Sequence, residues 1–156
     1  MSEVELLLLD SSENCTLYTI QFVNENKNEF EKFVSTFREN SEYSKDYLII
    51  AAFIKQIIER GALERYFRPE GKFNDNLVAI PIYKSKLRLY GLRLSDKILI
   101  LGNGGIKNTR TYQEDVLLSG YVLTLKRLDK ILKQEIANGN VIITKNNIQT
   151  DISFEL

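Results

Sequence analysis

The side chains best suited to chemistry lie in a basic, aromatic stretch in the middle of the chain. They are Lys84, Lys86, Arg88 and Tyr90, in or beside one predicted strand, and Lys107, Arg110 and Tyr112, after the next strand. Neighbouring strands of a meander bring such segments together. The resulting surface would bind phosphates by charge-assisted hydrogen bonds and stack a base on Tyr. It could also cleave RNA if a Lys or Tyr withdraws the 2′-hydroxyl proton and an Arg stabilises the phosphorane charge.

The composition excludes several other kinds of active site. The 156 residues include no His and only one Cys, Cys15. Zinc fingers, zinc hydrolases, Ser-His-Asp triads and Cys-His dyads all need imidazole or several thiolates. No pair of acidic residues stands out as a catalytic dyad, and no cofactor or metal is predicted. Cys15 has no His to activate it and is expected to be an ordinary, partly buried residue.

The charge distribution indicates an anionic partner. Basic and acidic residues balance over the whole chain, but residues 65–110 contain 10 basic and 3 acidic side chains, whereas residues 1–64 contain 6 and 12. Such asymmetry is typical of proteins that bind nucleic acid or an acidic protein segment. Arg65, Arg68 and Lys72, in a connecting loop over 65–76, are therefore further candidates for RNA binding. The alternative is that the basic strands lie against acidic helices of the first half.

A glycine-rich run over residues 102–105, ahead of Lys107, invites comparison with phosphate-binding loops. Neither G-x-x-x-x-G-K-[ST] nor G-x-G-x-x-G is matched, because a Lys stands where the last Gly should be. The favoured interpretation is a flexible basic loop over 102–110 in which glycines provide positive φ.

The first half of the chain predicts one strand and a helical hairpin. Residues 16–23 are rich in β-branched and aromatic residues and predict a strand. A helix over about 27–39 follows, with Asn26 and Glu29 as a weak capping signal. A second helix begins near Ser41 or Ser44 and ends at Gly61. No strand is predicted in the polar start of the chain.

The second half predicts a meander, a long helix and a terminal hairpin. Strands are expected over 77–83, 87–94 and 97–101, joined by tight turns. Thr111 and Glu114 form a capping box that opens a helix ending at Gly139. Residues 141–144 and 148–154 form the last hairpin. The prediction is an α+β fold with one domain over 1–156, in which residues 133–156 are a C-terminal extension.

No targeting or membrane segment is predicted. Glu3 and Glu5 occupy positions where a signal peptide carries basic residues, and the apolar run over 6–9 is too short to span a bilayer. With one thiol and no cysteine framework, a cytoplasmic location is expected.

Three short segments are KLRLY over 86–90, ILILG over 98–102 and IKNTRT over 106–111. In this order they resemble segments of the RelE/ParE toxin superfamily, particularly of its HigB-like and phage-derived members. Together with the order of predicted elements, the resemblance covers about residues 15–132. Three features depart from the family pattern: a paired Lys-Lys is reduced to Lys107, Ile80-Pro81 stands where an Arg is common, and the overall charge is neutral.

The resemblance implies a small toxin of a toxin-antitoxin pair that cleaves mRNA on the ribosome. A cognate antitoxin, often a helix-turn-helix protein, would hold it inactive. Arg88 would contact the scissile phosphate, Lys107 and Arg110 would be the basic residues after the last strand, Tyr112 would lie near the base, and Lys86 or Tyr112 would transfer the proton. The alternatives are a non-catalytic protein- or nucleic-acid-binding module and a gyrase-directed toxin of the same fold. The C-terminal extension is a candidate homodimer surface or a cover over the basic face.

Overall fold

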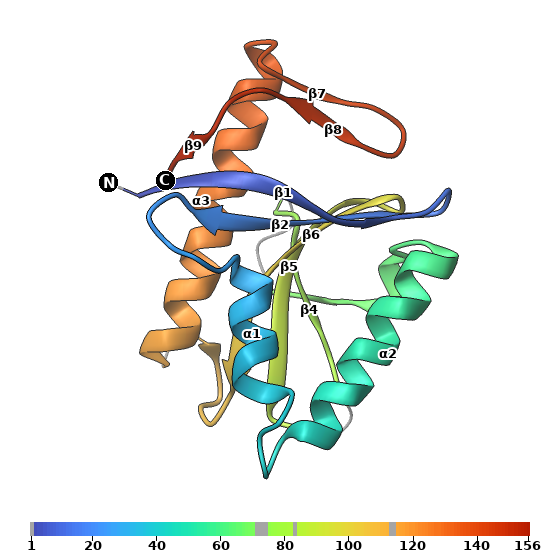
Figure 1. The fold of residues 1–156 in the computed structure, drawn as a ribbon, viewed down its shortest axis with the longest axis vertical. Helices are drawn as coiled ribbons and strands as arrows, with labels where there is room; N and C mark the ends of the chain where they lie inside the picture. The colour runs from blue at the N-terminus through green and yellow to red at the C-terminus, as the bar shows by residue number, and fades with distance from the viewer. Residues whose placement is uncertain (1, 71–74, 83, 113–114) are drawn as a thin grey trace.

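The computed structural model of this protein describes residues 2–70, 75–82, 84–112 and 115–156. Seven strands form one sheet, which lies across the middle of the protein (Figure 1). The strand order is β3-β4-β5-β6-β2-β1-β9, and β7 and β8 form a separate hairpin. The strands are β1 (Glu3–Ser11), β2 (Thr16–Phe22), β3 (Arg68–Pro69), β4 (Leu77–Ile80), β5 (Leu87–Ser95), β6 (Ile98–Ile106), β7 (Val141–Ile143), β8 (Ile148–Thr150) and β9 (Phe154–Glu155). The helices are α1 (Glu29–Phe37), α2 (Ser44–Arg60) and α3 (Val116–Ala137), with a short 3₁₀ turn over Glu64–Tyr66.

The sheet contains both parallel and antiparallel strand pairs. Strand β2 runs parallel to β6, from Thr16 opposite Ile98 to Thr19 opposite Leu101, and the other pairs are antiparallel. The chain between these two strands includes α1 and α2, which provide the long connection that a parallel pair needs. The predicted meander is confirmed as β4-β5-β6, and the α+β class is confirmed with it.

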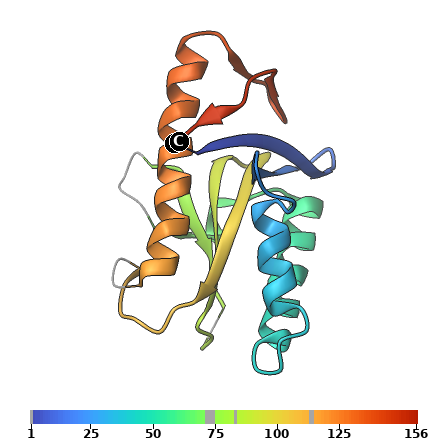
Figure 2. The same cartoon turned by 60° about the vertical axis from the view of Figure 1, so that its left-hand side comes forward.

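Helices cover both faces of the sheet (Figure 2). Along β6, Leu99 and Leu101 pack in the core under α1 and α2, whereas Ile98 and Ile100 pack in the core under α3. This alternation follows from the period of two in a strand. Because both faces are covered, β2 is buried at every position from Thr16 to Ile20.

The helix ends agree in part with the sequence. Gly61, at φ 106°, follows the last residue of α2, as predicted. Helix α1 is capped by Asn28 and Glu31, which form a capping box, so the predicted pair Asn26 and Glu29 was wrong. Helix α3 is capped by Asp115, whose side chain accepts from the Leu118 amide, so the predicted start at Thr111 was wrong. The predicted partner Glu114 lies outside the described residues.

The prediction of a polar, strandless N-terminus was wrong, because β1 pairs with β2 along most of its length. At its other side β1 pairs with β9, and the Leu156 amide donates to the Ser2 carbonyl at 2.8 Å, so the two ends of the chain lie together. The predicted terminal hairpin is confirmed as β7–β8. It packs in the α3-side core, where the Ile148 amide donates to the Tyr18 hydroxyl at 2.8 Å.

The glycine run is strand rather than loop. Strand β6 continues through Gly102, Gly104 and Gly105 to Ile106, and in the described residues only Gly61 and Gly139 are glycines with positive φ. A Cβ on Gly104 would lie 1.9 Å from the carbonyl oxygen of Arg88. Both the phosphate-loop comparison and the positive-φ interpretation are therefore replaced by close packing of two strands.

Among the helices that the structure describes, none combines the length and apolar character needed to cross a bilayer.

Candidate functional site

Three cationic side chains from the predicted basic block meet in one surface pocket of about 250 Å³. Arg68 comes from β3, and Lys107 and Arg110 come from the segment between β6 and α3. Glu70 and Tyr112 complete the polar lining, beside Pro69 and Thr111. Residues about forty positions apart in sequence are thus brought together. The sequence predicted that Lys107, Arg110 and Tyr112 would lie beside the strand that carries Arg88 and Tyr90, and it did not predict that Arg68 would join them.

The pocket is held by backbone hydrogen bonds at the ends of strands. Arg68 pairs with Ala79 of β4, which places it at the edge of the sheet. The Glu70 amide donates to the Leu77 carbonyl at 3.2 Å. On the other side, the Lys107 amide donates to the Lys86 carbonyl at 2.7 Å, which fixes the chain as it leaves β6.

The described residues that line the pocket include three cations and one carboxylate. Arg68 Nε lies 3.8 Å from Glu70 Oε1, and the Glu70 side chain is 10% exposed, whereas that of Arg68 is 56% exposed. With Lys107 and Arg110 beside this pair, three cations face one anion. An anionic ligand is therefore favoured, and the carboxylate offers a proton acceptor within the same pocket.

The two tyrosines of the predicted site are buried. Tyr90 is 1% exposed, and its ring lies edge-on to Tyr112 with 6.4 Å between centroids. Burial, reinforced by the negative charge of Glu70, raises the pKa of Tyr90 to about 12. Base stacking on Tyr90, which the sequence suggested, is incompatible with this burial. Tyr112 lines part of the pocket, but its side chain belongs mainly to the core on the α3 side of the sheet. Lys126 Nζ lies 5.7 Å from its ring centroid.

Arg88 is turned away from the pocket onto its own chain. Its Nη1 donates to the carbonyls of Ser85 (2.6 Å) and Leu87 (3.0 Å), which closes the turn before β5. Its buried Nε has no partner among the described residues. In this arrangement the predicted phosphate-binding Arg supports the strand end next to Lys86 and does not line the pocket.

The remaining predicted residues lie elsewhere. Lys84 and Lys86 are exposed on the segment between β4 and β5, and neither is among the described residues that line the pocket. The Lys86 carbonyl accepts from the Lys107 amide. Arg65 lies over the Tyr66 ring, with 5.3 Å from its guanidinium carbon to the ring centroid, and Tyr66 packs on the α2 side of the sheet. Lys72 lies outside the described residues.

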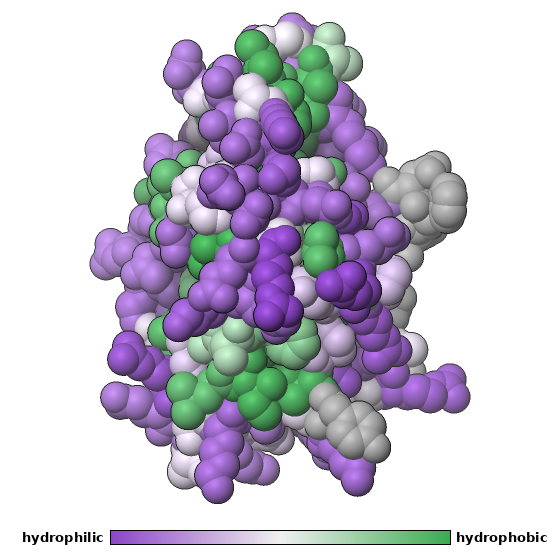
Figure 3. Space-filling view, turned by 90° about the vertical axis from the view of Figure 1, so that its right-hand side faces the viewer, coloured by the Kyte–Doolittle hydropathy of each residue, from purple (hydrophilic) through white to green (hydrophobic). Residues whose placement is uncertain are grey.

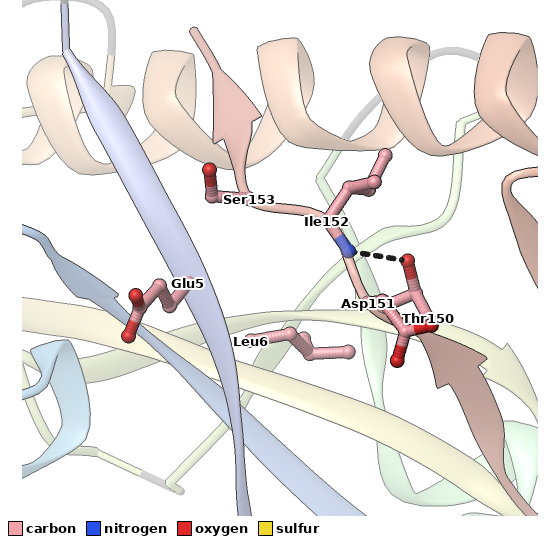
Figure 4. Close-up of a pocket in the computed structure, with 6 residues that line it drawn as sticks. All are labelled: Glu5, Leu6, Thr150, Asp151, Ile152 and Ser153. Carbon is pink, nitrogen blue, oxygen red and sulfur yellow. Dashed lines mark hydrogen bonds between the residues drawn. The ribbon is translucent and has the colours of Figure 1, made fainter.

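A second pocket, of about 290 Å³, has the opposite character. It lies between β1 and residues 150–153, and Figure 4 shows Leu6 between Glu5 and Asp151. The described residues that line this pocket include no cation. The Ile152 amide donates to the Thr150 hydroxyl at 3.2 Å. An acidic lining disfavours a phosphate ligand. Within the described ranges, no three acidic or cysteine side chains are grouped to hold a metal ion.

The C-terminal extension does not cover the basic pocket. Strand β9 lies at one edge of the seven-stranded sheet and β3, which carries Arg68, lies at the other. The extension instead closes the α3-side core with Val141, Ile148 and Phe154. Of the two roles predicted for the extension, the cover over the basic face was therefore wrong, and the homodimer surface stays a prediction.

Sequence reasoning missed Glu70 as a site residue. A single acid beside Pro69 in a basic loop carries no pattern that distinguishes it from a solvated charge. The pairing of β3 with β4 places its carboxylate beside Arg68 in the pocket.

Comparisons with protein-family models, with curated proteins and with solved structures find no match to this chain. The residues of the pocket, with their charges and distances, are therefore the basis for assigning a function.

Proposed function

We propose that the protein is a toxin of a toxin-antitoxin pair, a cytoplasmic endoribonuclease that cleaves mRNA on the ribosome and is held inactive by a cognate antitoxin, often a helix-turn-helix protein in the family that it resembles. The observation that carries the proposal is the meeting of Arg68, Lys107 and Arg110 around Glu70. Three cations suit a phosphate and its neighbour along an RNA strand. A carboxylate among them suits the removal of a 2′-hydroxyl proton.

In the proposed reaction, the Glu70 carboxylate accepts the proton of a 2′-hydroxyl, whose oxygen attacks the adjacent phosphorus. The bond from phosphorus to the 5′-oxygen breaks and leaves a 2′,3′-cyclic phosphate. The Lys107 ammonium gives a proton to the departing 5′-oxygen, and Arg110 and Arg68 stabilise the charge on the phosphorane. Glu70 replaces the Lys86 or Tyr112 predicted from sequence, because it is the one carboxylate among the described residues that line this pocket and the chain contains no His.

The proposal is tested by inducible expression in bacteria, with growth measured beside primer-extension mapping of translated messages. Wild type should arrest growth and produce new cuts at ribosome-occupied codons. Glu70→Gln should lower cleavage by about 10²- to 10⁴-fold, the usual contribution of a positioned base. Its affinity for RNA should be retained, because a negative charge is removed from the pocket.

Lys107→Ala and Arg110→Ala should weaken RNA binding, and Lys145→Ala is the matched control, since Lys145 is an exposed lysine between β7 and β8. Arrest without new cuts would contradict cleavage and direct attention to gyrase. Normal growth with intact messages and soluble protein would contradict the toxin.

A second candidate function is a non-catalytic RNA- or protein-binding module. The observation in its favour is Arg88, whose guanidinium is engaged with the Ser85 and Leu87 carbonyls. The two functions differ at Glu70: Glu70→Gln abolishes toxicity if the carboxylate transfers a proton, and leaves every phenotype unchanged if the pocket only binds.

A further inference from the structure

Strand β1 has an outer edge that is unpaired over most of its length. On the inner side β1 pairs with β2 from Val4 to Ser11, whereas on the outer side it pairs with β9 only at Glu3 and Val4. In the described part of the chain, no other strand lies beside β1. The outer side of residues 5–11, the β1 edge, is therefore open, and an open edge offers backbone N–H and C=O groups to another strand.

The backbone groups that face outward at the β1 edge belong to Leu6 and Leu8. The Glu3 carbonyl accepts from the Val23 amide on the β2 side, and the Ser2 carbonyl accepts from the amide of the residue that follows β9. Successive residues of an antiparallel strand direct their N–H and C=O groups to opposite sides. The even-numbered residues up to the bulge after Leu8 therefore present their N–H and C=O groups to the outer side.

The chain beyond β8 passes the β1 edge without closing it. The Ile152 amide donates to the Thr150 hydroxyl rather than to β1, and Figure 4 shows Leu6 directed from β1 toward this segment. Further along the edge, a pocket of about 340 Å³ lies between β1 and the β7–β8 hairpin. It is lined by Leu8, Ser11, Thr16, Tyr18 and residues 147–149. Because Leu8 is 62% exposed, the edge offers an apolar side chain that a further strand would cover.

The surroundings of the β1 edge are acidic. Residues 2–20 and 146–156, which form β1, β8, β9 and most of β2, contain six Asp and Glu residues and no Lys or Arg. Three pockets border these strands, and the described residues that line them include no cation. Lys145, in the β7–β8 turn, adjoins these segments in sequence, and Lys97 Nζ donates to the Glu13 carbonyl at 3.1 Å. Figure 3 shows that the side on which the β1–β2 and β7–β8 turns end is mainly hydrophilic, so a basic ligand is favoured.

We propose that the β1 edge binds an extended basic segment of another protein, which adds to the sheet as an antiparallel strand. Antiparallel pairing continues the direction of β9, which already occupies the start of the same edge. Residues opposite Leu6 and Leu8 would be apolar, because opposite residues share a face and Leu6 packs against the α3-side core. The alternate residues would be Lys or Arg, since Glu5 points to the other side of β1 and Asp151 lines the same pocket. The edge spans roughly 20 Å, which suits about six or seven residues.

A second copy of this chain is a poorer occupant of the β1 edge. Pairing two such edges would bring Glu5 and Asp10 of one copy among the same residues of the other, and like charges on neighbouring strands are destabilising. The open backbone groups therefore select a strand, and the acids around them select one of opposite charge.

This binding goes beyond the proposed cleavage and does not depend on it. Strand β9, beside the β1 edge, lies at one end of the seven-stranded sheet, and β3, which carries Arg68, lies at the other. Because the binding is measured without RNA, the failure of either proposal can be recognised separately.

The probe is a fluorescein-labelled eight-residue peptide that alternates valine and lysine, and the comparison peptide has glutamate in place of lysine. Fluorescence anisotropy with the full chain should give saturable binding of the lysine peptide and binding of the glutamate peptide that is weaker by roughly tenfold or more. Methyl groups on the valine nitrogens, which face β1 in the proposed pairing, should weaken binding by roughly tenfold or more. Methyl groups on the lysine nitrogens face away from β1 and should leave the affinity within about twofold of the parent peptide. This comparison separates strand addition from simple attraction of charges.

Glu5→Lys/Asp151→Lys should weaken binding of the lysine peptide by roughly tenfold or more. Glu39→Lys/Glu42→Lys is the matched control, because both acids are exposed in the connection between α1 and α2. Circular dichroism of each variant verifies folding, and the two N-methylated peptides test the wild-type chain directly. Equal affinity for the lysine and glutamate peptides, or equal effects of the two methylation patterns, would overturn the proposal. So would a wild-type dimer in the ultracentrifuge that the lysine peptide dissociates, because the edge would then belong to a second copy.

Discussion

Replacing Gly104 by Ala should be among the most destabilising single-methyl changes in this protein. Gly104 of β6 is paired with Leu89 of β5, and a Cβ at this position would lie 1.9 Å from the Arg88 carbonyl oxygen and 2.9 Å from the Leu89 Cα. Both atoms are backbone, so no rotamer change relieves the overlap and the strands themselves must separate. Adding a methylene to a packed core typically costs about 1–3 kcal/mol. We therefore expect a loss of at least ~3 kcal/mol, a large part of the ~5–15 kcal/mol that stabilises a domain.

The assay is chemical and thermal unfolding followed by circular dichroism, with two other glycines as graded controls. In a chain of this size, ~3 kcal/mol corresponds to a fall in Tm of about 6–12 °C. In Gly105→Ala the added Cβ would lie 3.1 Å from the Leu118 side chain, which can move, so the loss of stability should be smaller. Gly120→Ala meets nothing within 4 Å and lies inside α3, so it should stabilise the protein by about 0.8–1 kcal/mol.

The reasoning is refuted if Gly104→Ala unfolds within ~1 kcal/mol of wild type. A variant that kept its stability but lost RNA affinity would restore the view of this run as a ligand loop. The rank order Gly104, Gly105, Gly120 tests the packing argument more strictly than any single value, because the three changes add the same methyl group.

Three further predictions concern buried and charged groups. Desolvation raises the pKa of Glu29, against the opposing effect of Lys32, so the folded state holds this proton at a pH where the unfolded chain, with a pKa of about 4.3, has lost it. The stability that Glu29 contributes therefore falls as pH rises above that value. In urea unfolding, the free energy of unfolding of Glu29→Gln should rise relative to that of wild type as pH increases through this range. A difference between the two proteins that does not change with pH would contradict this. Burial raises the pKa of the Cys15 thiol to about 11, so a thiol-reactive dye should label native protein far more slowly than protein in denaturant. Equal labelling rates would show that the thiol is accessible in the native protein. Lys107→Ala should lower the salt dependence of RNA binding, log K against log[salt], by about 0.7, the value for one phosphate contact on a single strand, whereas Lys145→Ala should leave the slope unchanged.

The strands that the sequence predicted are those that alternate cleanly between two covered faces. In β6, Leu99 and Leu101 serve one core and Ile98 and Ile100 serve the other, and β5 behaves in the same way. Strand β1 escaped prediction because only Val4 along it is buried, and a bulge between Leu8 and Asp10 shifts its register. Its four consecutive leucines also show no alternation of apolar and polar residues, which is the pattern that predicts a strand.

The part of the candidate site that could be predicted from sequence is the part formed by charged residues close together in the chain. Lys107, Arg110 and Tyr112 lie within six residues of one another, so any turn after the strand brings them together. The position of Glu70 depends on the pairing of the two-residue strand β3 with β4, which leaves no hydrophobic pattern in the sequence. Alternation along β5 predicts only the face of the sheet on which the Arg88 side chain begins. It does not predict that the guanidinium donates to two carbonyls of its own turn instead of extending into solvent.

The basic pocket and the glycine packing are mechanically connected through β6. Gly104 sets how closely β6 approaches β5, and three residues later the Lys107 amide is bound to the Lys86 carbonyl at the start of β5. Separation of the two strands at Gly104 would move Lys107 away from Arg68, which is held at the far side of β4. The proposed phosphate binding by these cations would therefore depend on close packing of strands rather than on a flexible glycine loop. For this reason Gly104→Ala should lose RNA affinity together with stability, whereas Lys107→Ala should lose affinity alone.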